Sequence, residues 1–394
     1  MNQNIVNKFK NAKNNIIFIV TILVSLLFIF GGYNYFSDYK TENYDDVEIV
    51  RAKVLSIDNI EETESFLSNI NKRISFTAEI TSGKEKGQTH SIDQILDSFL
   101  TMQDKEIAQG DKILIAYTDY TESNEFEWTF IGYNRLDALL ILSGVFILLL
   151  LIIGGRKGIN TIISLILTCL VIFLVYIPSV LSGFNIYIST TIVGAFIIFM
   201  SLIIINGVNK KTICAIAGNI GGVIVAALIA MYMNNILKLS GFVDDDFLYL
   251  SLVNPESPLN LVAIIWGGMV LGSLGAIMDV AMTIASSMNE LAEHMHEKSF
   301  TKMLRCGLNI GRDAIGTMTN TLILAYIGSS LALVMLLIVN TKNTLFLFSL
   351  EMIAVQVVQS LMGIIGILLA VPITAGFSAF IYNRKKTGQH SKEQ

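Results

Sequence analysis

The stretch GAIMDVAMTIASSMNEL, residues 275–291, holds a carboxylate, Asp279, inside a long apolar run. An ionised group in the hydrocarbon layer of a membrane costs about 2.5–3.5 kcal/mol on insertion scales. The stretch therefore predicts a membrane-spanning helix that turns Asp279 away from lipid, on a face that packs against other helices. At helical spacing, Asp279 shares one stripe with small and polar residues, namely Gly268, Gly272, Gly275, Thr283, Ser286 and Glu290.

The composition supports a membrane protein. Of the 394 residues, 53% are hydrophobic and 15% are charged, whereas a soluble domain usually has about 25% charged residues. The net charge of −5 offers no basic surface for nucleic acid. The sequence has no P-loop, GxSxG, HExxH or CxxC pattern. We therefore expect no enzyme, no cofactor and no metal site.

Eight apolar segments approach or exceed the roughly 20 residues that a membrane-spanning helix needs. The first has a basic start and could be a signal peptide, but no small-residue cleavage site follows, so we interpret it as a retained span. The eight segments are 15–35, 137–154, 158–181, 187–207, 212–234, 259–288, 314–340 and 348–382.

The distribution of basic residues predicts that both termini are cytoplasmic. The short loops on the predicted outer side hold only Lys238 and Lys342, and the inner segments hold many more Lys and Arg residues. We divide the chain into a cytoplasmic tail with the first span, an outside domain, a seven-helix membrane domain and a basic tail. Their residues are 1–35, 36–134, 135–383 and 384–394.

The outside domain, residues 36–134, has the pattern of a β-rich fold. Five short segments rich in β-branched and aromatic residues alternate with turn signals such as SGKEKG and QGDK. This pattern predicts a small barrel or half-sandwich resembling an OB fold, with a short helix near residues 92–101.

A second outer segment, residues 234–258, mixes Phe242, Phe247 and Leu248 with three consecutive acids, Asp244 to Asp246. It is either an amphipathic piece lying on the membrane interface or a plain acidic loop.

The seventh span carries polar residues at the depth of Asp279. Asp279 lies roughly 13 Å above the inner end of its helix, and Thr321 lies roughly 12 Å above the start of its own. We therefore expect Asp279 to face Thr317, Asn320 and Thr321 across an antiparallel helix pair. The acid either fixes helix packing as a satisfied structural group, or carries protons or cations.

Two neighbouring spans add further polar and small residues. Gln356 and Gln359 lie on one stripe of the eighth span, and we count them as coupling candidates beside Thr283. Gly218, Asn219 and Gly222 of the fifth span fit either the same cavity or simple packing. The glycine stripe of the sixth span, Gly268, Gly272 and Gly275, suits close helix packing within the chain or in a homo- or hetero-oligomer.

The motifs GAIMDVAMTIASSMNEL, LNIGRDAIGTMTNTLILAYIGSSL and VPITAGFSAF resemble the YibE/YibF-like family of bacterial membrane proteins. The resemblance covers residues 135–383. It implies a multispanning protein of the bacterial cytoplasmic membrane with an N-terminal domain outside, and it leaves the activity open.

The sixth to eighth spans, in which Gly275–Asp279 are followed by a cytoplasmic helix and a threonine-rich climbing helix, are also similar to the membrane core of the SecD/SecF and RND families. In those families an acid beside a threonine-rich helix belongs to proton-driven machinery. The likeness covers about 110 residues, and this chain has two spans more than a six-helix unit of that kind. We therefore expect a proton- or ion-coupled permease or exporter of an unknown small molecule or ion, embedded in the lipid bilayer. The alternative is a membrane scaffold that presents the outside domain to a partner or to the cell envelope.

Overall fold

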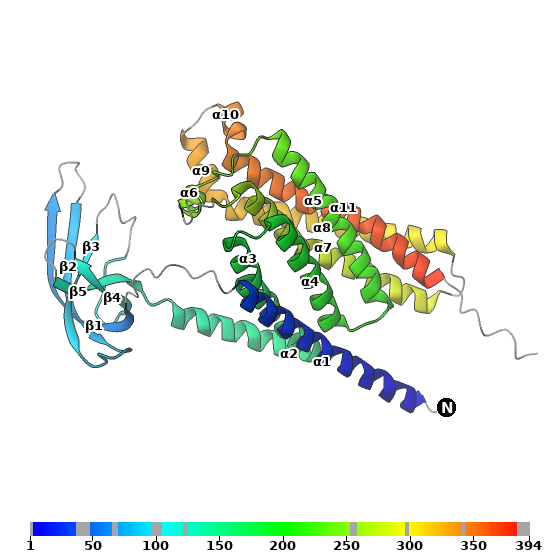
Figure 1. Cartoon of the computed structure of the whole chain (residues 1–394), viewed down its shortest axis with the longest axis horizontal. Coiled ribbons are helices and arrows are strands. Elements are labelled where there is room, and N and C mark those ends of the chain that lie inside the picture. Colours follow the sequence, from blue (N-terminus) through cyan, green and yellow to red (C-terminus); the bar gives the residue numbers. More distant parts are fainter. Residues whose placement is uncertain are drawn as a thin grey trace, which may run out of the picture. The chain divides into compact units, whose positions relative to one another are not determined.

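A computed structural model describes residues 3–36, 48–64, 70–96, 105–120, 125–252, 258–295, 299–340 and 343–383. The chain divides into two compact units (Figure 1). The helical unit comprises Met1–Tyr39 and Gly154–Gln394, and the other unit, Lys40–Ile153, contains the β domain and the first part of α2.

Long helices make up most of the helical unit (Figure 1). The first elements are α1 (Gln3–Phe36), α2 (Leu136–Val171), the π-helical turn η1 (Ile172–Tyr176), α3 (Ile177–Leu181), α4 (Ile186–Asn206) and α5 (Lys210–Ile236). They are followed by α6 (Asp245–Leu252), α7 (Leu261–His294), α8 (Phe300–Ser329), α9 (Leu331–Asn340), α10 (Thr344–Ser349) and α11 (Glu351–Asn383).

Within the described ranges, six helical segments are long and apolar enough to cross a membrane. The segment Leu136–Leu181 has 46 residues, which at 1.5 Å per residue is roughly 69 Å, more than twice the hydrocarbon thickness. It is broken at Gly155, whose φ of 51° and ψ of −130° are not helical. This break lies between the two spans predicted at 137–154 and 158–181.

The seventh predicted span, 314–340, is divided between α8 and α9, with a break at Ser330. Its helix begins earlier than predicted, at Phe300, because the polar residues that precede the apolar run are also helical. This pair is not among the six apolar segments. In the second outer segment, residues 245–252 form the helix α6, so this part is not a plain loop.

The start of α5 and the ends of α7 and α11 lie together at one end of the helical unit. Lys210 at the start of α5 lies 5.8 Å from the ring of Tyr382 at the end of α11, and Tyr382 donates a 2.8 Å hydrogen bond to Asn289 near the end of α7. At the start of α11, the Glu351 carboxylate accepts hydrogen bonds from the Ser240 hydroxyl and the Gly241 amide, both 2.7 Å long. The helices therefore alternate in direction as the sequence predicts.

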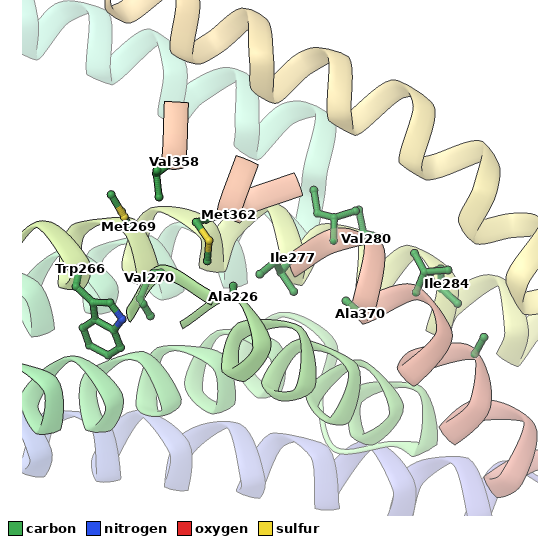
Figure 2. Close-up of a cluster of buried hydrophobic side chains, with 14 of the residues drawn as sticks. Ala226, Trp266, Met269, Val270, Ile277, Val280, Ile284, Val358, Met362 and Ala370 are labelled. Carbon is green, nitrogen blue, oxygen red and sulfur yellow. The ribbon is translucent and has the colours of Figure 1, made fainter. Parts of the chain in front are cut away.

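The core of the bundle is formed where α5, α7 and α11 pack against one another (Figure 2). The large side chains come from α7, among them Trp266 and Ile277, while α5 and α11 offer small residues. A Cβ atom placed on Gly222 would lie 2.7 Å from the carbonyl oxygen of Gly366 and 2.9 Å from Ile277. Close backbone approach of α5 and α11 therefore depends on glycine.

The β domain is one antiparallel sheet with the strand order β3-β2-β1-β4-β5. The strands are β1 (Ile49–Glu64), β2 (Ile70–Ile80), β3 (Thr89–Leu96), β4 (Lys112–Tyr120) and β5 (Glu125–Tyr133). Strands β3 and β5 also contact each other, so the sheet curls into a half-barrel. The β-rich prediction is confirmed, but the helix predicted over residues 92–101 is wrong for residues 92–96, which extend β3. The remainder of that segment, residues 97–101, lies outside the described residues.

Apolar residues alternate along the strands and fill the half-barrel. Ile74, Phe76, Ala78 and Ile80 of β2 are all buried, because every second side chain of a strand points to the same face. Val50, Ala52, Ile92, Ile113 and Ile115 of the neighbouring strands complete this core.

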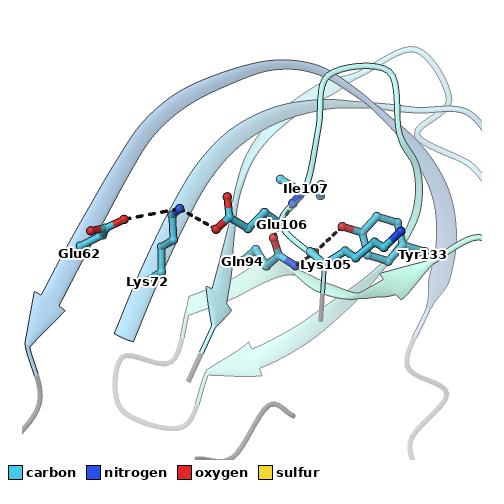
Figure 3. A network of polar contacts seen from close by, with 7 residues as sticks. All are labelled: Glu62, Lys72, Gln94, Lys105, Glu106, Ile107 and Tyr133. Atoms are coloured by element: carbon cyan, nitrogen blue, oxygen red, sulfur yellow. Dashed lines mark hydrogen bonds and ion pairs between the residues drawn. The ribbon is translucent and has the colours of Figure 1, made fainter. Parts of the chain in front are cut away.

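A buried glutamine joins the segment before β4 to the half-barrel (Figure 3). Gln94 is only 1% exposed. Its amide donates to the carbonyl of Lys105 and accepts from the amide of Ile107, both at 3.0 Å. The Tyr133 hydroxyl donates to the same carbonyl of Lys105. These bonds satisfy polar groups that would be costly to bury alone.

An ion-pair network lies beside this glutamine. The Lys72 ammonium is 2.7 Å from Glu106 and 3.5 Å from Glu62. The hydrogen bond with Glu106 is the main cause that raises the pKa of Lys72. Because the pKa is raised in the folded state, the stabilisation is complete below pH 10.5 and is lost as the pH rises through the folded value.

We predict opposite effects for two glycine substitutions in α8. A Cβ atom on Gly311 would overlap with Val371 of α11, whereas one on Gly316 has no atom within 4 Å. Gly311→Ala should therefore lower the thermal midpoint of the detergent-solubilised protein, through overpacking that costs about 1–3 kcal/mol. Gly316→Ala should leave it unchanged or raise it, since alanine favours helix by about 1 kcal/mol. Equal midpoints for the two variants would contradict the α8–α11 packing.

Candidate functional site

The polar stripe of α7 lies open on the surface of the chain. Asp279, Gly268, Gly275 and Thr283 are all exposed. A Cβ atom on Gly268 or Gly275 would meet nothing within 4 Å. The face of α7 that packs inside the bundle is the opposite, apolar one, which carries Ile277 (Figure 2).

This arrangement corrects the expectation that the stripe containing Asp279 is the packing face within the chain. The sequence pattern separates two faces of α7 but does not say which one packs. Inside the bundle, the small residues of α5 and α11 already provide the close approach, and the large side chains of α7 fill the remaining space. Gly268, Gly275 and Asp279 of the small-residue stripe are therefore left uncovered by α5 and α11.

Gly272 is the member of the stripe that meets other helices. A Cβ atom there would lie 3.6 Å from the amide nitrogen of Gln359 on α11 and 3.8 Å from the hydroxyl of Tyr326 on α8. Tyr326 is absent from the sequence-based candidates, because an aromatic residue in an apolar helix is more often core or interface. The polar groups of Gln359 and Tyr326 thus lie beside the stripe at Gly272, two helical turns or roughly 10 Å along α7 from Asp279.

The predicted partners on α8 lie level with Asp279. Helices α7 and α8 are antiparallel: Gly307 lies beside Met288, and Tyr326 lies beside Gly272. Interpolation between these two contacts places Asp279 at the level of the α8 turn that contains Thr317.

Thr317, Asn320 and Thr321 are exposed, as Asp279 is. In the described part of the chain, no hydrogen bond or ion pair joins Asp279 to any of them. The Thr317 and Thr321 hydroxyls donate instead to carbonyls of their own helix, at 3.1 and 2.9 Å. The structure brings these residues to one depth but not into contact.

A largely apolar cavity of about 540 Å³ lies between α8, α9, α10 and α11. Tyr326 and Gln356 line it together with Ser330 and Ser360, and the other lining residues are aliphatic or aromatic. Because Tyr326 also approaches Gly272, the cavity and the polar stripe share one side chain. The two glutamine candidates thus have separate places, Gln356 at the cavity and Gln359 beside the stripe.

A second polar feature is buried in the packed core. Asn219 of α5 is fully buried, and in the described part of the chain neither its amide oxygen nor its amide nitrogen has a hydrogen-bond partner. It lies between Gly218, which would overlap with Thr374 if it carried a Cβ atom, and Gly222. A buried amide without a partner costs free energy, so this side chain needs an explanation.

The fold and these sites define a polytopic helical membrane protein with a small β-rich domain. The family model of the YibE/F-like proteins matches residues 142–384. The chain therefore belongs to the YibE/F-like family. The match covers the bundle from α2 to α11 and does not include the β domain. No curated protein and no solved structure shows a significant match to the chain.

We predict that the buried amide of Asn219 is a net cost to stability. Asn219→Val removes two unpaired polar atoms with only a small gain in side-chain volume, so the free energy of unfolding should rise by about 1–3 kcal/mol. The measurement is the thermal midpoint in detergent. Asn289→Val is the matched control and should lower the midpoint, because Asn289 bonds to both Tyr382 and Glu293. A lower midpoint for Asn219→Val would contradict this prediction.

Proposed function

We propose that the protein is a proton- or ion-coupled permease or exporter of an unknown small molecule or ion, with Asp279 as the coupling carboxyl. The observation that carries this proposal is the open polar stripe in the middle of α7. Asp279 lies 18 residues from Leu261 and 15 from His294, roughly 27 and 22 Å along the helix. We expect no enzymatic activity, since the sequence has no catalytic motif.

The energetics of the membrane support a transport role. A carboxylate at this depth is expensive unless it is neutral or reaches water. Gly268, Gly272 and Gly275 carry no side chains, and in this proposal they let water approach Asp279 along α7. A carboxyl group that meets water on alternate sides can bind a proton on one side and release it on the other.

The hydroxyl and amide groups of α8 are suited to receive this carboxyl. Thr317, Asn320 and Thr321 are at its level, and Thr283 lies one turn away on α7. Hydroxyl and amide groups can bond a carboxyl in either protonation state. A shift of α8 along α7 would exchange the present bonds of Thr317 and Thr321 to backbone carbonyls for bonds to Asp279. This exchange would tie the protonation of Asp279 to helix movement.

The apolar cavity provides a place for a substrate near this route. Tyr326 contributes to the cavity and approaches the stripe at Gly272. A ligand in the cavity would therefore contact a side chain that lies two helical turns from Asp279. The cavity wall favours an apolar or amphipathic ligand held by a few polar contacts. The β domain, residues 36–134, would bind or dock this substrate outside the cytoplasmic membrane.

The alternative function is a membrane scaffold. The β domain forms a compact unit with its own core, which is the feature that favours presentation of this domain to a partner or to the envelope. In that case, the open stripe of α7 would be covered by another chain in an oligomer, and Asp279 would have no access to water.

The experiment is a pH titration of Asp279 by carbodiimide labelling of the full chain in liposomes. Dicyclohexylcarbodiimide modifies protonated carboxyl groups in apolar surroundings, and peptide mass analysis locates the product. The proposal predicts labelling at Asp279 that decreases as the pH is raised, because only the protonated carboxyl group reacts. It also predicts no labelling at this position in Asp279→Asn.

Asp313→Asn is the matched control. It removes an exposed carboxylate that lies on α8 instead of α7, and it should leave the labelling of Asp279 unchanged. Labelling of Asp279 that is independent of pH, or absent at every pH in the folded protein, would contradict proton exchange. Either result would favour the scaffold.

A further inference from the structure

A cavity of about 380 Å³ lies between α1, the second part of α2 and α4, away from the stripe of Asp279. Its polar lining consists of Asn15, Arg156, Asn160 and Asn206, and its apolar lining consists of Phe18, Ile159, Ile163 and Ile203 to Ile205, with Gly207 at the end of α4. All of these residues belong to the helical unit.

The position of the cavity matches the headgroup layer of a membrane. Asn15 is the first residue of the apolar segment of α1, and Asn206 is the last of α4. The polar wall therefore lies where the spans end, and Phe18 and Ile163 lie further inside. The cavity is also at the end of the bundle that carries the basic segments, where the inner leaflet and its anionic lipids are expected.

Arg156 gives the cavity its chemistry. Its Nη2 atom donates a 2.8 Å hydrogen bond to the side-chain oxygen of Asn15, which orients the guanidinium. A guanidinium has five N–H donors in a planar fork that suits phosphate oxygens, so further donors remain for a ligand. The amide groups of Asn160 and Asn206 add neutral donors on the same wall.

We propose that this cavity is a binding site for an anionic phospholipid. The phosphate would bind Arg156 and the asparagine amides, and an acyl chain would lie along Phe18, Ile159 and Ile163. The proposal does not depend on the transport function. The competing explanation is structural: Arg156 would only offset the negative end of the α4 dipole near Asn206.

Lys157 distinguishes a built site from general attraction to a charged membrane. It follows Arg156 in the chain and is also exposed, but it does not line the cavity. Loss of one positive charge affects non-specific attraction equally at either position. Binding in a specific site lined by Arg156 is weakened when Arg156 is replaced and is unaffected when Lys157 is replaced.

The test is lipid binding to the full chain in detergent, measured by native mass spectrometry. Phosphatidylglycerol is titrated against phosphatidylcholine with the same acyl chains. We expect Arg156→Gln to weaken phosphatidylglycerol binding at least tenfold, Arg156→Lys to weaken it less, and Lys157→Gln to leave it unchanged. Ile163→Trp keeps every charge but fills the apolar wall, so it should also weaken binding.

Three results would overturn the proposal. The first is an equal effect of Arg156→Gln and Lys157→Gln. The second is unchanged lipid binding in both Arg156→Gln and Ile163→Trp, whatever their stability. The third is displacement of phosphatidylglycerol by millimolar inorganic phosphate, which would identify a free anion as the ligand.

Discussion

The packing of α7 against the close contact between α5 and α11 is the constraint on which the membrane domain depends. Gly222 and Gly366 allow these two helices to approach, and Ile277 of α7 fills the space beside them. Association of helices in lipid relies on such close van der Waals contact, because lipid is as apolar as the side chains. This contact also fixes the rotation of α7. Once its large side chains face inward, the stripe of Gly275 and Asp279 must face away from α5 and α11.

The consequence is a carboxylate that the bundle itself leaves uncovered. Within a bilayer, such a group must be neutral, reach water or be covered by another chain. The two proposed functions differ in which of these applies. A transporter needs water to reach Asp279 along the glycine path, whereas a scaffold needs a second chain against the same path. The site of Arg156 is separate, since it lies at the end of the spans and uses helices α1, α2 and α4.

The sequence predicted the helical bundle and the β-rich domain because both follow from local periodicity. The alternation in β2 and the lengths of the apolar runs need no knowledge of neighbours. The rotation of α7 could not be predicted in this way, since the pattern defines a small-residue face but not the helix that meets it. Counting residues along two antiparallel helices matched the depth of Asp279 with that of Thr321, and the contacts between the helices place Asp279 about one turn away, level with Thr317. The lack of contact between Asp279 and Thr317 depends on the tertiary packing of α8 on α11 through Gly311. Residues 92–96 form a strand rather than the predicted helix because they pair with β2, a contact that the local sequence does not reveal.

The central claim is that water reaches the Asp279 stripe while the opposite face of α7 is sealed. The most direct measurement is the reactivity of single cysteines toward N-ethylmaleimide in native membranes, after replacement of Cys169, Cys214 and Cys306. Maleimide reacts with the thiolate, which forms only where water has access. The account predicts rapid labelling of Gly275→Cys and none of Ala281→Cys, whose position is fully buried. An unreactive Gly275→Cys in folded protein would contradict it.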